Sequence, residues 1–362
     1  MDPRAVAEQA LRLFFVARPP SPRGGAAEEL ARLLREASAR ALRVVERFSR
    51  DRRAHDRLGL PFADLRVEDL DGLAAEPAPM GLLAMATMAR SGYVRQAAIQ
   101  RLDEHVEPLT FGLLLSRLND PVRFVAAAAD AALRRHLVHL QPVGLVRYLP
   151  LLDALDSWKR SRDHAIVPLV EARLESLAGA AALREATTDR DVDLRLAALR
   201  RQARQTEGHV LEAVLRDALG ARDPRVRLWA AQAASDAADE VRDALLPVMA
   251  DNRTPAIRLT ALRAMRRSAT HEHRLVRACF DPNANVRLYA RLAVRDRRLD
   301  HAARARSILR DADAPKGDLV GALAVLSDLG TREDLALVRP FADDGRASVA
   351  AEAERTVALL TA

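Results

Sequence analysis

Two histidines three residues apart are the first side chains in the sequence whose spacing could support chemistry. On a helix, His136 and His139 share one face, where two imidazoles can bind a single metal ion. No third ligand lies near them in the sequence, and a zinc site takes at least three protein ligands. The pattern therefore favours packed or solvated histidines, and we expect neither a metal ion nor a cofactor.

The remaining reactive residues are isolated from one another. One His-Glu-His tripeptide occupies positions 271–273, at a turn or a helix start, and Cys279 is the only cysteine. A single cysteine cannot form an intramolecular disulfide, so we expect a buried structural thiol in a reducing compartment. The glycine pair at 24–25 lacks the preceding strand that a phosphate-binding loop requires. We predict no catalytic residues.

A short sequence phrase recurs along the chain and points to the elements that position these residues. It consists of a turn residue, often Asp-Pro, then a branched apolar residue, then arginine, then a helix of small residues. One copy runs from Asp223 to Arg227, and others end at Arg195, Arg258 and Arg287. The steps from 195 to 227, to 258 and to 287 are 32, 31 and 29 residues. A period in this range is typical of an α-solenoid built from helix pairs.

The composition favours helices throughout. Hydrophobic residues make up 49 % of the chain and aromatic residues only 4 %, a mixture suited to close-packed helices and an all-α fold. Residues 1–76 lack the repeat, and we predict an N-terminal helical cap or small helical domain there, with a long helix over 26–50. Residues 77–362 are predicted to form about nine antiparallel helix pairs. The third pair, with helices expected over 143–155 and 158–177, lacks a clean copy of the phrase.

Targeting signals are not evident in the sequence. Residues 1–20 carry charges throughout and no uninterrupted apolar stretch, so we predict no signal peptide. No run approaches the roughly 18 apolar residues of a membrane span. Together with the single cysteine, this leads us to expect a cytoplasmic protein without a membrane partner.

The phrase and the helix pairs, over about residues 78–361, resemble HEAT repeats of the short bacterial type also found in phycobilin lyase-like proteins. The resemblance implies a right-handed superhelix with the second helix of each pair on its concave side. It also implies that the repeated arginine joins an aspartate ladder between neighbouring repeats; those arginines here are Arg95, Arg123, Arg195, Arg227, Arg258 and Arg287. The alternative is that they bind phosphate groups. Most members of the family are scaffolds or adaptors, and a few are enzymes.

The residue that follows each arginine is the unusual feature of the repeat. At about 100° per residue this position points away from the helix-pair core, where a polar side chain is expected. Apolar residues occupy it in five helices, namely Phe124, Leu196, Leu228, Leu259 and Leu288. Neighbouring positions add Arg200, Arg263, Arg266, Arg291 and Arg295. An apolar stripe edged by arginines predicts a partner-binding groove; the alternative is that tight superhelical curvature buries the leucines.

The charge distribution leaves two classes of partner open. The net charge is +7, and residues 195–310 hold 24 arginines against 13 acidic residues. Such a basic stretch attracts either nucleic acid or an acidic protein. Our leading hypothesis is a non-enzymatic protein–protein interaction scaffold or adaptor whose groove binds a helical or extended, acidic and apolar segment. The alternative is a nucleic-acid-binding solenoid, with DNA-repair glycosylase activity as one form of it.

Resemblances to HEAT-fold enzymes are narrower. Alkylpurine DNA glycosylases of this fold use aromatic residues and an aspartate in the groove, and the nearest candidates are Trp158 and Asp163. A separation of five residues places these two about 140° apart on a helix, on different faces. Di-iron hydroxylases of this fold use several inward-facing His-Glu pairs, whereas this chain has one such dipeptide. A lyase-like or metal-using enzyme remains a third hypothesis.

Overall fold

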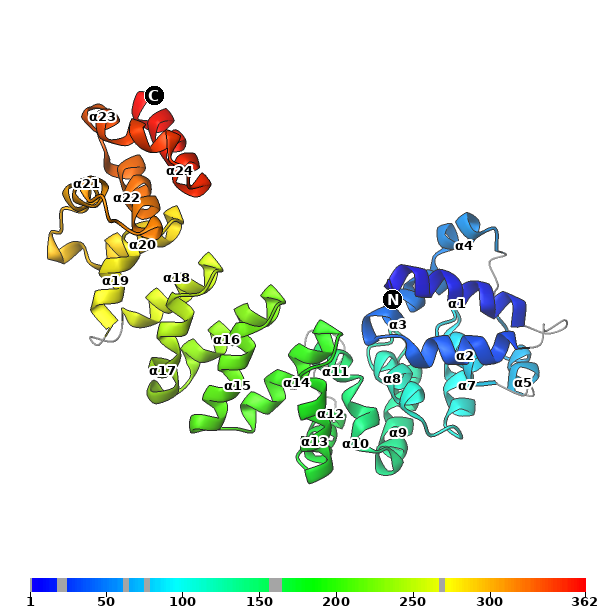
Figure 1. Cartoon of the computed structure of the whole chain (residues 1–362). Helices are drawn as coiled ribbons and strands as arrows, with labels where there is room; N and C mark the ends of the chain where they lie inside the picture. Colours follow the sequence, from blue (N-terminus) through cyan, green and yellow to red (C-terminus); the bar gives the residue numbers. More distant parts are fainter. Residues whose placement is uncertain (1, 18–24, 61–64, 75–78, 156–164, 267–270) are drawn as a thin grey trace. The chain divides into compact units, whose positions relative to one another are not determined.

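The structure is a computed structural model that describes the whole chain except residues 1, 18–24, 61–64, 75–78, 156–164 and 267–270 (Figure 1). The regular elements among the described residues are helices, α1 to α24 with three short 3-10 segments, and this part of the chain contains no strand. The predicted all-α class is therefore confirmed. The chain divides into two compact units, unit 1 over residues 1–205 and unit 2 over residues 206–362.

Unit 1 contains fourteen of the described α-helices. Their bounds are α1 (Pro3–Ala17), α2 (Ala26–Glu36), α3 (Ala39–Arg50), α4 (Arg52–Leu58), α5 (Asp69–Ala74), α6 (Pro79–Ala86), α7 (Gly92–Leu102), α8 (Pro108–Arg117), α9 (Arg123–His139), α10 (Pro142–Val146), α11 (Leu149–Leu155), α12 (Ile166–Leu174), α13 (Leu177–Ala186) and α14 (Val192–Arg204).

Unit 2 contains the other ten described α-helices. Their bounds are α15 (Gly208–Gly220), α16 (Pro224–Asp236), α17 (Asp239–Ala250), α18 (Pro255–Met265), α19 (Glu272–Ala278), α20 (Ala284–Ala293), α21 (His301–Arg310), α22 (Lys316–Leu329), α23 (Leu335–Val338) and α24 (Ala347–Thr361). The 3-10 segments η2 (Arg295–Arg297), η3 (Arg332–Asp334) and η4 (Arg339–Asp343) connect them.

The division of the chain differs from the boundary predicted near residue 76. Helices α1 to α3 pack against α6, α8 and α11, and a single cluster of buried apolar side chains runs from Val6 to Ala198. At the contact of α2 with α6, a Cβ added to Gly81 would lie 2.7 Å from the backbone nitrogen of Ala31, so the two backbones touch. Arg147 also donates a hydrogen bond of 3.0 Å to the carbonyl of Ala37. The N-terminal helices therefore belong to unit 1.

Two predicted helices are each broken in two. The helix expected over 26–50 ends at Glu36 and restarts at Ala39, because Ser38 caps the second segment by accepting from the amide of Ala41. The helix expected over 143–155 ends at Val146 and restarts at Leu149. Pro150 explains this break, since proline lacks an amide hydrogen and its ring clashes with the carbonyl four residues earlier.

Local capping sets the start of the second helix in several pairs. Asp191, Asp223 and Asn283 each precede a helix and accept hydrogen bonds from amides of its first turn. Proline opens α16 and α18, where its fixed backbone angle suits the first turn and its missing amide costs nothing. The turn part of the repeated phrase is thus a helix-start signal.

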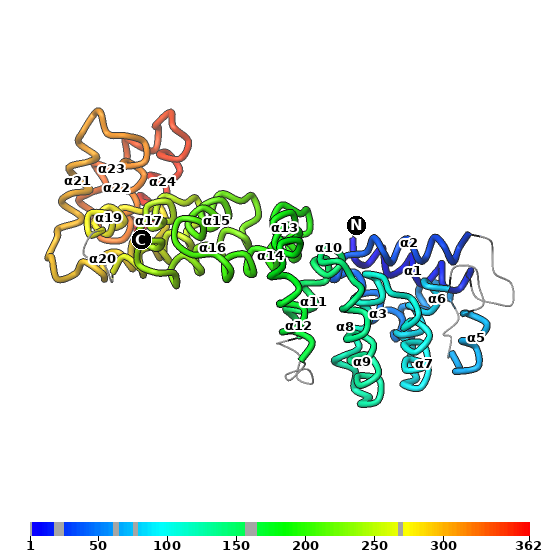
Figure 2. The backbone as a smooth tube through the Cα atoms, turned by 90° about the horizontal axis from the view of Figure 1, so that it is seen from below, coloured from blue at the N-terminus to red at the C-terminus, as the bar shows by residue number. Residues whose placement is uncertain are grey.

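Unit 2 shows the pairing of helices most clearly (Figures 1 and 2). Each first helix packs on the second helix that follows it, as α15 does on α16, α17 on α18 and α19 on α20. The second helices also contact one another in sequence, α16 with α18 and α18 with α20. Residues at matching positions of these three helices therefore form a row along one side of unit 2.

None of the helices in the described part of the chain has both the length and the apolar composition needed to cross a membrane.

Candidate partner-binding surface

Four of the predicted ladder arginines share one hydrogen-bonding geometry. Arg95, Arg258 and Arg287 each donate from Nη1 to a backbone carbonyl five or six residues earlier, at 2.7–2.9 Å. The rest of each guanidinium forms a two-point ion pair with an aspartate from the next helix pair: Asp120, Asp281 and Asp328 respectively, at 2.6–3.0 Å. These arginines therefore link neighbouring pairs and are not available to bind phosphate.

Arg227 has the same geometry with a neutral acceptor. Its Nη1 donates to the carbonyls of Ala221 and Arg222, at 2.8 and 2.7 Å, and its Nη2 donates to Thr254 Oγ1 at 3.1 Å. Thr254 precedes α18, yet its side chain makes no capping hydrogen bond to that helix. Its hydroxyl accepts from the arginine of the preceding pair instead.

The other two predicted ladder residues, Arg123 and Arg195, differ from these four in helix position or in hydrogen-bond acceptor. Arg95, Arg227, Arg258 and Arg287 are each the fourth residue of their helix, whereas Arg123 is the first residue of α9 and is exposed. The ladder prediction is wrong for Arg123. Arg195 is the fourth residue of α14, and its recorded hydrogen bonds go to the carbonyl of Asp189 in its own turn.

Two buried arginines that the phrase does not mark take part in similar networks in unit 1. Arg201 lies near the end of α14 and binds Asp153 at 2.6 Å and Glu171 at 3.0–3.1 Å. Arg117, at the end of α8, binds both Glu46 and Asp120. Nothing in the sequence separates these arginines from exposed ones, because their acceptors come from distant helices.

The apolar position after the ladder arginine is exposed on two of three adjacent helices of unit 2. Leu228 on α16 is 47 % exposed and Leu288 on α20 is 52 % exposed, while Leu259 on α18, between them, is half-buried. Leu292, one turn beyond Leu288, is 56 % exposed and was not predicted. We call Leu228, Leu259, Leu288 and Leu292 the leucine row. Its exposure is what the sequence pattern predicts for a surface position.

The predicted arginines of unit 2 divide into surface and structural residues. Arg263, Arg266 and Arg295 are exposed, and the guanidinium of Arg263 lies 5.9 Å from the centre of the Tyr289 ring. Arg291 is mostly buried and binds Asp328 at 2.9 Å, beside Arg287. Arg291 is therefore a structural residue, and the other three can border the leucine row.

In unit 1 the predicted groove residues do not form a matching row. Leu196 is only 8 % exposed, because α14 packs against both α11 and α13, so the expected surface leucine is buried there. Arg200 is exposed and lies 3.4 Å from Asp153. Phe124 is 37 % exposed and stacks on Tyr93, with ring centres 5.3 Å apart. Tyr93, which the sequence did not mark, makes this an exposed aromatic pair.

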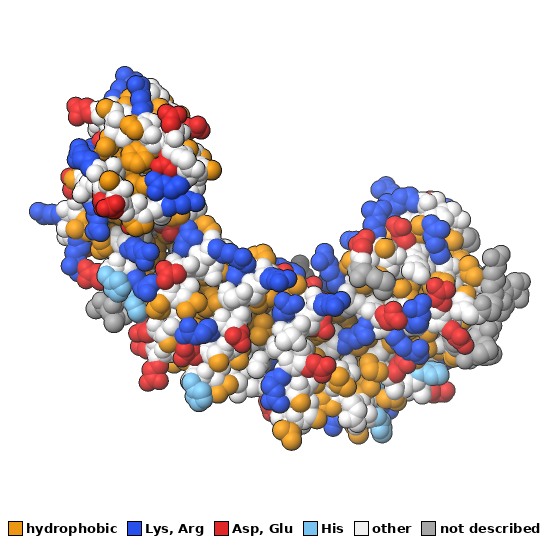
Figure 3. All heavy atoms as spheres, in the orientation of Figure 1, with side chains coloured by type: hydrophobic (Ala, Val, Ile, Leu, Met, Phe, Trp, Pro, Cys, Tyr) orange, Lys and Arg blue, Asp and Glu red, His pale blue; other side chains and the backbone are white. Residues whose placement is uncertain are grey.

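Basic side chains are spread over both units. On the face drawn in Figure 3, arginine and lysine side chains alternate with hydrophobic and acidic ones. The arginine excess counted over residues 195–310 includes Arg287, which is neutralised by Asp328 outside that range, whereas Asp281, the partner of Arg258, is already among the acidic residues counted. The charge available to an external partner is thus smaller than the sequence count indicates.

In the part of the chain that the structure describes, the residues with possible chemistry do not assemble into a reactive centre. His136 is fully buried with its Nε2 3.2 Å from the Asp103 carbonyl, and burial lowers the pKa of this imidazole, whereas His139 is exposed. Cys279 is fully buried, and burial raises the pKa of its thiol to about 11. Trp158 and Asp163 lie outside the described residues. Among the residues described, no group of three or more histidine, cysteine, aspartate or glutamate side chains could hold a metal ion.

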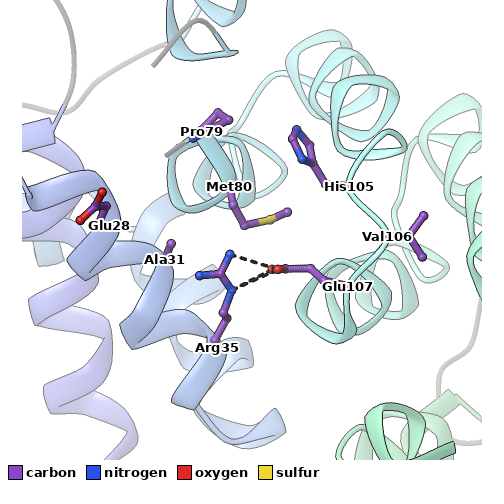
Figure 4. A pocket seen from close by; sticks show the side chains of 8 residues that line it. All are labelled: Glu28, Ala31, Arg35, Pro79, Met80, His105, Val106 and Glu107. Carbon is purple, nitrogen blue, oxygen red and sulfur yellow. Dashed lines mark hydrogen bonds and ion pairs between the residues drawn. The ribbon is translucent and has the colours of Figure 1, made fainter. Parts of the chain in front are cut away.

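A pocket of about 650 Å³ lies in unit 1, where α2 and α6 meet the start of α8 (Figure 4). Arg35 and Glu107 point toward one another across it, and Arg35 Nε donates to both carboxylate oxygens at 3.1 Å. Met80 lies behind the pair and supplies an apolar wall. The ion pair satisfies both charges and connects α2 to the start of α8. The pocket offers no nucleophile paired with a base.

No family model matches the chain, and no curated protein is significantly similar to it. One similar solved structure is the crystal structure of an engineered protein, with 15 % sequence identity over 99 % of this chain and 99 % of that chain and a TM-score of 0.30.

Proposed function

We propose that the protein is a HEAT-like, right-handed α-solenoid that binds a partner protein and catalyses no reaction. The observation that carries the proposal is the leucine row, exposed on α16 and α20 and half-buried on α18 between them, together with the exposed Arg263, Arg266 and Arg295. Exposed leucines at matching positions of packed helices are unusual on a surface without a partner. The stacked helix pairs and the arginine–aspartate links between them support the HEAT-like assignment.

The chemistry of the surface specifies the partner as an amphipathic helix with leucine-type and acidic residues. Leucines bind an apolar helix stripe, and the bordering arginines favour glutamate or aspartate beside it. Packed helices lie about 8–10 Å apart, so a row across three helices spans about 20 Å. At 1.5 Å per residue, about 13 residues of a partner helix would cover it.

A fluorescent model peptide tests this function. A helical peptide of about 18 residues, with leucines at i, i+3, i+4 and i+7 and glutamates between them, should bind the full-length protein, and a scrambled peptide should not. Leu228→Asp with Leu288→Asp should weaken binding about 30-fold, since each places a carboxylate in the apolar contact. Leu359→Asp is the matched control, because Leu359 is 51 % exposed on α24. Equal loss in the control would refute the proposal.

The alternative, nucleic-acid binding, depends on the exposed Arg263, Arg266 and Arg295. The salt dependence of binding distinguishes it from peptide binding. Binding of a DNA duplex through phosphates should fall steeply with salt concentration, while peptide binding through the leucine row should persist. Duplex binding that survives the leucine substitutions and is lost on replacing the three arginines by glutamine would favour the alternative.

A further inference from the structure

A second recess in unit 1, of about 360 Å³, is lined mainly by charged and polar side chains. It lies between α3 and the turn from α8 to α9. Arg43 and Arg50 of α3 line it from one side, and Arg117 lines it from the end of α8. The carboxylates on its wall are Glu46 and Asp120. Its mainly charged lining distinguishes it from the pocket that the Arg35–Glu107 ion pair spans.

Among the described residues, the arginines in and beside this recess outnumber the carboxylates that pair with them. Arg95 and Arg117 share Asp120, at 2.6–2.8 Å and 3.4 Å, while Arg117 and Arg50 share Glu46, the latter at 3.1 Å. Within the described ranges, the guanidinium groups of Arg50, Arg95 and Arg117 thus face the two carboxylates of Glu46 and Asp120. Arg95 and Arg117 are each 3 % exposed and Asp120 is buried, so water screens this excess poorly.

Excess positive charge in a poorly hydrated site is costly unless an anion accompanies it. The pKa of Arg50 reflects that cost: burial lowers it, and Arg117 and Arg95 lower it further, against the opposing effect of Glu46. Asn119 also lines the recess, and its buried Oδ1 accepts no hydrogen bond from the described protein. Turning this amide by 180° would put a donor in place of this unpartnered acceptor, and the two orientations are nearly equivalent in shape.

We propose that this recess binds a small phosphate-bearing anion, held by Arg43 and Arg50 and attracted by the excess positive charge around the buried Arg117. Guanidinium groups present planar pairs of donors that match phosphate oxygens. The volume is at the lower end of the range for small-molecule sites, about 300–1,000 Å³, which suits a phosphate or a small phosphate ester. The site belongs to unit 1 and does not depend on the partner surface proposed for unit 2.

Calorimetric titration of the full-length protein tests the proposal, with inorganic phosphate and glycerol 3-phosphate as separate probes at low ionic strength. Arg50→Gln should weaken binding about tenfold or more, the effect of losing a charged hydrogen-bond donor. Arg43→Gln should weaken it several-fold. Tighter binding of the ester than of free phosphate would identify an esterified ligand, and the reverse would identify phosphate itself.

Arg47→Gln is the matched control, because Arg47 is exposed on the same helix and does not line the recess. It should change affinity by less than about twofold, as expected for a distant screened charge. If Arg50→Gln lowers the melting temperature, Arg43→Gln decides, since Arg43 is exposed at the recess and the melting temperature of this variant is measured alongside its affinity. Absence of binding by either probe, or equal weakening by Arg47→Gln, overturns the proposal.

Discussion

The same sequence phrase has different structural outcomes in the two units. In unit 2, from α16 to α20, each repeated arginine is the fourth residue of its helix and reaches an acceptor in the next helix pair. In unit 1, Arg95 on α7 makes the same link, but Arg123 opens α9 and is exposed, and Arg195 on α14 binds a carbonyl in its own turn. The comparison shows that the arginine becomes a link only when its helix position and a nearby acceptor coincide.

The leucine that follows the arginine differs between the units in the same way. Leu228 and Leu288 are about half exposed in unit 2, whereas Leu196 in unit 1 is buried. Helix α14 contacts both α11 and α13, and Leu196 to Leu199 are buried in succession along it. A surface position in one helix pair is therefore an interior position in another, because the neighbouring helices pack differently.

The largest effect in this comparison should come from removing a buried link. Arg287→Ala should destabilise unit 2 by about 3 kcal/mol, at the low end for a broken buried pair because Arg291 still neutralises Asp328. Arg123→Ala should cost less than about 0.5 kcal/mol, as a surface substitution. The rate of Cys279 alkylation reports the loss in unit 2, since this single thiol is buried there and reacts only after opening, and thermal melts report the Arg123 variant. Equal destabilisation by the two substitutions would remove the distinction.

Acid should weaken the same link. Burial opposes ionisation of Asp328, but hydrogen bonds from Arg287 and Arg291 outweigh it, so its pKa lies below the usual value. A carboxyl with a lowered folded pKa contributes stability that is complete above its unfolded pKa, about 3.9, and is lost as pH falls through the folded value. Wild-type protein should therefore lose more stability below about pH 4 than Asp328→Asn, as followed by thermal melts. Parallel pH profiles would contradict this assignment.

A smaller gain should follow from converting the neutral link into an ionic one. Thr254→Asp places a carboxylate beside Arg227 and ahead of α18, where it can bind the guanidinium or cap the helix. We expect unit 2 to gain about 1 kcal/mol, read as slower Cys279 alkylation. Thr260→Asp is the control, because the Thr260 hydroxyl donates to the Ala256 carbonyl within α18 and does not pair with a ladder arginine. Destabilisation by Thr254→Asp would mean that the hydroxyl is required at this position.

Much of the fold could be predicted from local sequence signals. The period of about 30 residues, the capping residues and the helix-opening prolines correctly placed most helix pairs, because they act within a few residues along the chain. Two predicted helices were too long, since Ser38 and Pro150 interrupt an otherwise continuous apolar pattern. The boundary near residue 76 was not found, because the contacts of α1 to α3 with α6, α8 and α11 join segments distant in sequence.

The candidate surface could be predicted only in part. Leu228, Leu288, Arg263, Arg266 and Arg295 lie on the surface as the helical angles indicate. Tyr93 and Leu292 were missed, since a single exposed tyrosine or leucine carries no pattern of its own. The recess lined by Arg50 and Arg117 gave no sequence signal, because packing between helices brings together two arginines that are 67 residues apart in sequence.

The sequence alone determined the helical class, the starts of the second helices and the repeated arginine, since each depends on interactions within one helix or turn. Tertiary structure alone decided which arginines became links, which leucines stayed exposed and where the chain divides into two units. Helical periodicity gives the direction of a side chain relative to its own axis. Burial and pairing depend on what the neighbouring helices place in that direction, and that information is spread over the whole chain.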